Sequence, residues 1–287
     1  MRTTCIITDN SAQFPQISFP GRDRVRVISL DVEYRHQLLP EGGSLKVSDL
    51  DPVATPETAP RLVPPSVETF QELYTSLGRI YDNILVILMS GQLSGAYENA
   101  QEAAEHLQGA RPIQVINSQT TSIGLGILVQ AAAEAIEQGM SVTDTERLIR
   151  QMIPHIYTLV CTPSLSYLHY SGFADHAQAA VGEMLGIYPI FTLEEGRLTP
   201  LDKVRGYRYA LDYYQEFIEE FDNLRHIALL QGSPSVSPAT KMLRQFAQEC
   251  FPNTKYTEHT MNLPFALLFG PRALSLMVVE DPDEDAS

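Results

Sequence analysis

Short apolar runs that alternate with helical patterns constrain the fold of this chain more than any other feature. Four runs in the first half have the length and composition of strands: Cys5–Thr8, Val25–Val32, Ile84–Met89 and Ile113–Ile116. Between them lie segments with helical spacing: Val67–Ile80, Tyr97–Leu107 and Ile123–Glu137. This alternation predicts a parallel sheet covered by helices.

The second half has a more mixed pattern. After a helix predicted at 144–152, the pattern changes near Pro154, and 287 residues suffice for two domains. We predict an N-terminal α/β domain at 1–157, a smaller α/β domain at 158–280 and an acidic, disordered tail at 281–287. Glu280, the last residue of the second domain, is expected to be solvated like the tail. Further predicted elements are a hairpin around Glu195-Gly196-Arg197, helices at Tyr207–Glu220 and Pro238–Cys250, and strands at His226–Leu230 and Ala273–Val279.

The stretch 38–65 is rich in Pro, Gly, Glu and Thr, which suits a long surface excursion better than a strand or a helix. We expect this excursion to lie over an opening.

Charge and cysteine content exclude several classes of function. A formal net charge of -15 disfavours nucleic acids and anionic membrane surfaces as partners. No run approaches the ~20 apolar residues that span a bilayer, so no membrane insertion is expected. Cys5, Cys161 and Cys250 are scattered and odd in number, which is typical of a protein of the reducing cytoplasm.

The strongest local signal is the segment Ser90–Tyr97, which joins a buried strand to a helix that begins near Gly95. Free amides and the positive end of the helix dipole make such a turn a site for a carboxylate or a phosphate, and Ser94 can add a hydroxyl donor. In a parallel sheet this is also the carboxyl edge, where ligands bind. The alternative is that Ser94 only caps the helix, as serine does very often.

Other candidate motifs for chemistry are incomplete. Gln92 stands where a nucleophile elbow needs glycine, and Val129 stands where a dinucleotide loop needs its third glycine. None of the seven histidines has compact metal-ligand spacing, so no metal is expected. Asp9, after the first strand, either orients a ligand or builds a turn. We therefore expect no enzymatic activity, although an enzyme with Asp9 as base is kept as an alternative.

In their order along nearly the whole chain, these segments resemble the DegV family of bacterial lipid-binding proteins. Thr8-Asp9-Asn10-Ser11 is similar to the Thr-Asp-Ser that ends the first strand of the family. Ser90–Tyr97 is similar to its Ser-x-x-Leu-Ser-Gly-Thr-Tyr signature, and Leu62–Ser66 holds the position of its Thr-Ser-Gln-Pro-Ser loop. Gly172 and Gly270-Pro271 continue the series.

The resemblance implies a two-domain α/β fold with a fatty acid in a cleft between the domains. It implies that Ser94, Gly95 and Ser90 hold the carboxylate, and that the tail is buried in the second domain. The bound fatty acid would be the ligand, with no other cofactor. Cleft residues are expected to be Asp9, Ser11 and Gly270. Tail-lining candidates, with ordinary core as the alternative, are Leu165, Leu168, Ile187 and Ile190.

Four positions depart from the family pattern. Leu62 replaces a hydroxyl and Leu268 replaces a histidine near the headgroup, and Ala96 replaces the Thr of the signature. Fewer donors remain for a buried carboxylate, so a lipid with a less charged head is an alternative ligand. Family members present the bound acid to a separate kinase, and Phe173 in place of the family arginine argues against that partner. The further alternative is a protein that no longer binds lipid and acts through protein contacts.

Overall fold

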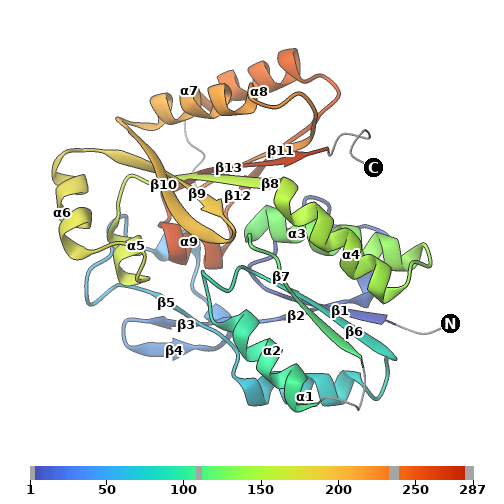
Figure 1. The fold of residues 1–287 in the computed structure, drawn as a ribbon. Coiled ribbons are helices and arrows are strands. Elements are labelled where there is room, and N and C mark those ends of the chain that lie inside the picture. Colours follow the sequence, from blue (N-terminus) through green and yellow to red (C-terminus); the bar gives the residue numbers. More distant parts are fainter. Residues whose placement is uncertain (1–3, 108–111, 233–238, 282–287) are drawn as a thin grey trace.

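The parallel sheet predicted for the first half is present, with the strand order β2-β1-β6-β7 (Figure 1). The computed structural model describes residues 4–107, 112–232 and 239–281. Its parallel strands are β1 (Thr4–Asp9), β2 (Val25–Ile28), β6 (Asn83–Leu88) and β7 (Ile113–Asn117). All residues of β1 and β6 are buried, because helices cover both faces of the central strands.

The predicted helices of the first half are confirmed, and they lie in two layers. Helices α1 (Val67–Leu77) and α2 (Ala96–His106) lie on one face of the parallel sheet, and α3 (Ser122–Glu137) and α4 (Val142–Met152) on the other (Figure 1). Over the described ranges, no helix combines the length and the apolar composition that crossing a bilayer requires.

The second half forms a mixed six-stranded sheet in the order β10-β9-β8-β13-β11-β12. Its strands are β8 (Ile156–Cys161), β9 (Tyr188–Glu194), β10 (Arg197–Val204), β11 (Leu224–Gln231), β12 (Lys255–Thr260) and β13 (Leu274–Glu280). Helices α7 (Tyr207–Ile218) and α8 (Ala239–Cys250) cover one face (Figure 1). The predicted hairpin, helices and strands of this half are confirmed.

Alternating residues of this second sheet belong to two different apolar clusters. Leu159 and Leu229 pack beneath α7 and α8, whereas Val160 and Leu230 belong to the cluster that also contains the core of the parallel sheet. One core thus runs from the parallel sheet to the inner face of the second sheet. The expected boundary at residue 157 falls inside β8, and the division into two domains stays a prediction.

The prediction of a single strand over Val25–Val32 is wrong. Residues 29–30 separate β2 from β3 (Asp31–Tyr34), and the Leu30 amide donates to Asn10 Oδ1 at 3.0 Å. A side chain, and not a neighbouring strand, thus accepts the Leu30 amide, and β3 pairs antiparallel with β4 (Gln37–Leu39) and β5 (Arg61–Val63). The stretch 38–65 therefore carries short strands at both ends, which its composition does not predict.

Four further elements have no counterpart in the sequence prediction: α5 (Ser166–Tyr170), α6 (His176–Met184), α9 (Leu263–Phe269) and β12. Short 3-10 turns lie at Arg22–Arg24, Pro40–Gly42, Val47–Asp49 and Ile153–His155. The expectation that Glu280 belongs to a solvated tail is wrong, because Glu280 ends β13 and accepts a 3.0 Å hydrogen bond from the Tyr157 hydroxyl. The rest of the predicted tail, after residue 281, lies outside the described residues.

His226 on β11 is a buried histidine in basic surroundings. Its side chain is 6% exposed, and Nε2 lies 2.8 Å from Thr257 Oγ1. Burial, followed by the charges of Lys255, His259 and Arg225, lowers the pKa of the imidazole to about 4. The folded protein therefore keeps this ring neutral.

Acid should destabilise the fold through this imidazole. The unfolded chain binds the proton near the ordinary pKa of 6.5, and the folded chain only near 4. The contribution of His226 is complete above pH 6.5 and is lost as the pH falls towards 4. His226→Gln can still bond Thr257 but does not titrate. We expect the free energy of unfolding, measured with urea, to fall between about pH 7.5 and about pH 5. The fall should be larger for the wild type than for the variant by about 2 kcal/mol. Equal losses in both proteins would contradict the assignment.

Candidate functional site

The turn between β6 and α2 is fixed by backbone hydrogen bonds. The Ser90 amide donates to the Thr120 carbonyl at 2.8 Å, which ties the turn to the segment that follows β7. The amides of Leu93 and Ser94 both donate to the Ser90 carbonyl, at 2.9 and 3.2 Å. Ser94 is thereby held at the beginning of α2, as the sequence predicts.

Ser94 does not act as the helix cap. The N-cap residue is Gly95, and no side chain caps α2. The Ser94 hydroxyl accepts only a long bond, 3.4 Å, from the Ala96 amide. Within the described part of the chain its hydroxyl hydrogen has no acceptor, and the residue is only half-buried. The hydroxyl is therefore available to a ligand at a helix N-terminus.

Ser90 has a structural partner instead. Its side chain is fully buried and donates a 2.7 Å hydrogen bond to the carbonyl of Gly196, at the tip of the β9–β10 hairpin. A Cβ on Gly196 would lie 2.4 Å from Ser90 Oγ, and the φ of Gly196 is +80°. This contact holds the hairpin of the six-stranded sheet against the turn of the parallel sheet, and it occupies the Ser90 hydroxyl.

Gly196→Ala should therefore destabilise the protein by about 2 kcal/mol or more, because strain at positive φ adds to the clash with Ser90. Gly186 also has positive φ, +61°, but a Cβ there would meet nothing within 4 Å, so Gly186→Ala is the matched control. In the control, the free energy of unfolding should fall only by the cost of a side chain at positive φ, which is about 1 kcal/mol. Urea unfolding of both variants measures the difference, and equal losses would show that the hairpin contact adds nothing.

Asp9 is a structural carboxylate rather than an exposed base. It has no exposed surface, and its two oxygens accept the amides of Ser11 at 2.9 Å and Met89 at 2.7 Å. Burial raises the pKa of the Asp9 carboxyl, and hydrogen bonds from Ser11 and Met89 oppose that rise. Ser11 and Gly270 are buried as well. The three expected cleft residues therefore pack inside this structure.

Asn262 is a site residue that sequence reasoning missed. Its Oδ1 accepts the Phe265 amide at 3.3 Å and so caps α9, while its Nδ2 donates to the Ser11 carbonyl at 2.8 Å. Proline near the first position of α9 completes a recognisable helix start in the sequence Asn262-Leu263-Pro264. By joining α9 to the end of β1, Asn262 positions Leu268.

A cavity of about 240 Å³ lies beside the Ser94 turn. It brings together Leu62 from β5, Leu268 from α9 and Leu93, the residue before Ser94. Its other lining residues are Arg61, Tyr170, Ser171 and Gly172. Two positions that the family resemblance assigns to the headgroup thus meet in one cavity, and both carry apolar side chains.

A second cavity, of about 390 Å³, has Leu165 and Ile187 in its wall. Leu168 is fully buried in the main core, and Ile190 is fully buried in the cluster beneath α7 and α8. Of the four tail candidates, the structure therefore brings two together at a cavity and places the other two in core.

Helix α5 lies between residues of the two cavities, since Tyr170 lines the first and Leu165, just before α5, lines the second. The excursion 38–65 is attached to this helix. The Tyr167 hydroxyl donates to the Asp51 carbonyl at 2.6 Å, and Ser166 Oγ accepts the Ala54 amide at 2.8 Å. The excursion also supplies Arg61 and Leu62 to the first cavity, as expected of a segment over an opening.

Together these features define an α/β protein in which a helix start, at the carboxyl edge of a parallel sheet, lies next to a cavity lined by three leucines and by polar groups that include Arg61. The chain belongs to the DegV family: a sequence model described as "Uncharacterised protein, DegV family" matches residues 3–281.

Relatives and solved structures agree with this assignment. A DegV domain-containing protein of Caldanaerobacter subterraneus subsp. tengcongensis is 27% identical, over 76% of this chain and 78% of its own. The fatty acid binding DegV family protein of Streptococcus agalactiae has the same fold, with a TM-score of 0.84, 21% identity, and coverage of 98% of this chain and 100% of its own. The Fatty Acid Kinase (Fak) B3 protein of Streptococcus pneumoniae, solved with linoleic acid, gives 0.81 at 20% identity, covering 97% and 100%.

Proposed function

We propose that this protein binds a long-chain fatty acid or a similar single-tailed lipid without covalent chemistry. The headgroup lies at the Ser94–Gly95 helix start, and the tail occupies the apolar space toward α5 and the second sheet. The observation that carries this proposal is the cavity lined by Leu62, Leu93 and Leu268 beside a serine hydroxyl that has no acceptor in the described structure.

The physics of the site supports a ligand with one polar end and one long apolar end. Amides at the start of α2 and the Ser94 hydroxyl offer donors to a headgroup. Each CH₂ of a buried tail adds roughly 0.8 kcal/mol, so the tail dominates the affinity and one held end is enough. The solved neighbours from Streptococcus agalactiae and Streptococcus pneumoniae, one described as fatty acid binding and one holding linoleic acid, support the same ligand class.

We propose further that the protein is a cytoplasmic carrier with no reaction of its own. The free cysteines Cys5, Cys161 and Cys250 fit a reducing compartment. The polar groups nearest the turn are engaged in structure, because Ser90 donates to Gly196 and Asp9 accepts two amides. Transfer of the acid to a partner kinase is supported by the Fak B3 neighbour and opposed by Phe173 at the position of the family arginine.

The first test is ligand binding itself. Native mass spectrometry of protein purified from cells, and of delipidated protein with added palmitate, should show one lipid per chain. Ser94→Ala should weaken palmitate binding by about tenfold to a hundredfold, the equivalent of one lost hydrogen bond to a charged group. Ser76→Ala, on the exposed surface of α1, is the matched control and should bind like the wild type.

The lipid proposal would be disproved if the purified protein carried no lipid and bound neither palmitate nor hexadecanol when these were added. If Ser94→Ala bound palmitate as tightly as the wild type, lipid binding would still hold, but the headgroup would not lie at this turn.

A second candidate ligand is a lipid with an uncharged head, and a specific observation favours it. Leu62 and Leu268 face the cavity at the headgroup end, where a carboxylate would need donors. Leu62 is half-buried on the short strand β5, so substitution there is tolerable for the fold.

A pair of substitutions at Leu62 separates the two ligands. Leu62→Thr adds a hydroxyl donor, and Leu62→Val has nearly the same shape without the donor. We expect the Thr variant to bind palmitate about tenfold more tightly than the Val variant, while both bind hexadecanol equally. Competition with a fluorescent fatty acid measures both affinities. Equal palmitate affinity in the two variants would show that the headgroup does not reach β5.

A further inference from the structure

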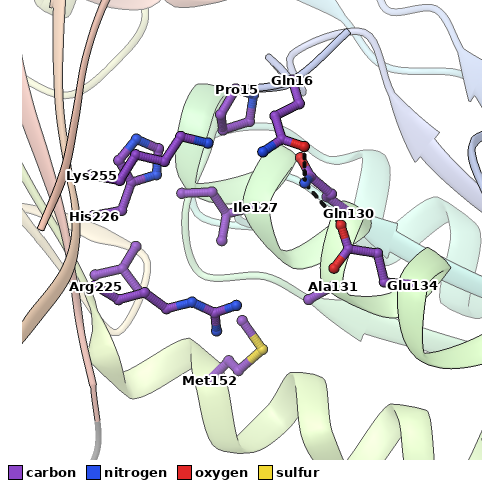
Figure 2. A pocket seen from close by; sticks show the side chains of 11 residues that line it. Pro15, Gln16, Ile127, Gln130, Ala131, Glu134, Met152, Arg225, His226 and Lys255 are labelled. Carbon is purple, nitrogen blue, oxygen red and sulfur yellow. Dashed lines mark hydrogen bonds between the residues drawn. The ribbon is translucent and has the colours of Figure 1, made fainter. Parts of the chain in front are cut away.

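A separate cavity of about 230 Å³ lies between α3 and the β11–β12 side of the six-stranded sheet (Figure 2). Arg225 of β11 and Lys255 of β12 extend into it from one side, and Gln130 and Glu134 of α3 lie on the other. It shares no lining residue with the two cavities near α5.

The two cations in this cavity have no carboxylate partner. In the part of the chain that the structure describes, neither Arg225 nor Lys255 is within 4.0 Å of an acidic oxygen. Acidic residues outnumber basic ones by 15 in this chain, so carboxylates are plentiful elsewhere. Two cations on the strand side of one cavity, without such a partner there, create a local positive potential on an otherwise negative protein.

His226 does not relieve this charge. It pairs with Lys255 across β11 and β12 and lines the same cavity, where its Nε2 is engaged with Thr257. Because the ring is neutral above its lowered pKa, it adds no charge, and no anionic group is among the described residues that line the strand side of the cavity.

The opposite wall carries the Glu134 carboxylate. Gln130 Nε2 donates to Gln16 Oε1 at 3.3 Å and to Glu134 Oε1 at 3.0 Å, as the dashed lines in Figure 2 show. Gln130 therefore holds the Glu134 carboxylate on the helix side. The cavity is complementary to a molecule with an anionic group at one end and hydrogen-bond donors at the other.

We propose that this cavity binds a small organic phosphate, with its phosphate on the strand side, in the field of Arg225 and Lys255, and its amino or hydroxyl donors facing Glu134. A phosphate dianion matches two cations, and the guanidinium of Arg225 can bond two of its oxygens. Apolar contacts from Ile127 and Met152 leave room for a short carbon chain between the two ends. This site is independent of lipid binding.

The test is isothermal titration calorimetry of the full chain with three probes: O-phosphoethanolamine, inorganic phosphate and ethanolamine. We expect O-phosphoethanolamine to bind more tightly than phosphate and ethanolamine not to bind. Arg225→Ala with Lys255→Ala should weaken both phosphate probes at least tenfold. Lys46→Ala, which removes an exposed lysine in the excursion 38–65, should change neither. Glu134→Gln should reduce the advantage of O-phosphoethanolamine over phosphate.

Rising NaCl gives a measure that needs no variant, because the wild-type affinity for both phosphates should fall with salt. No saturable binding of either phosphate, or equal affinity in the wild type and the double variant, would overturn the proposal. Palmitate loading of the double variant, followed by native mass spectrometry, should remain normal, so a failure here is distinguishable from a failure of the lipid proposal.

Discussion

The buried carboxylate of Asp9 is the constraint on which the carboxyl edge of the parallel sheet depends. A carboxylate without exposed surface is tolerated only when hydrogen bonds replace its water, and here the amides of Ser11 and Met89 do so. These bonds fix the ends of β1 and β6 relative to each other. Ser90, which follows Met89, donates a hydrogen bond to the β9–β10 hairpin. The Ser11 carbonyl accepts a hydrogen bond from Asn262, which caps α9. The turn at Ser94 and the leucine at position 268 are thus placed by one polar network.

The sequence predicts the elements whose own pattern decides their structure. β1, β6 and β7 are apolar runs of strand length, and the helices around them have regular apolar spacing. The run Val25–Val32 is misread because its apolar pattern continues across the point where the side chain of Asn10, 20 residues earlier, accepts the Leu30 amide. β12 is missed because an edge strand with Lys255, Glu258 and His259 lacks an apolar face long enough to recognise.

The candidate site shows the same division between local and distant information. A helix start at Gly95 can be predicted from the residues around it. The pairing of Ser90 with Gly196 cannot, since 106 residues separate them and both are ordinary turn residues in sequence. Burial alone does not identify a tail pocket either. Leu165 and Ile190 are equally apolar in the sequence, yet Leu165 lines a cavity while Ile190 packs beneath α7 and α8.

The two proposed ligands are selected by different forces, and on a chain with a net charge of -15 both must be held by local groups. At ordinary ionic strength the field of distant carboxylates is screened over about 10 Å, so local groups decide which anion is held. Near Ser94 a helix terminus and a hydroxyl offer donors, Arg61 lies in the wall of the neighbouring cavity, and a long apolar tail contributes most of the binding free energy. At Arg225 and Lys255 the balance is reversed, because two cations without a carboxylate partner in the described structure can hold a small polar anion that buries almost no apolar surface.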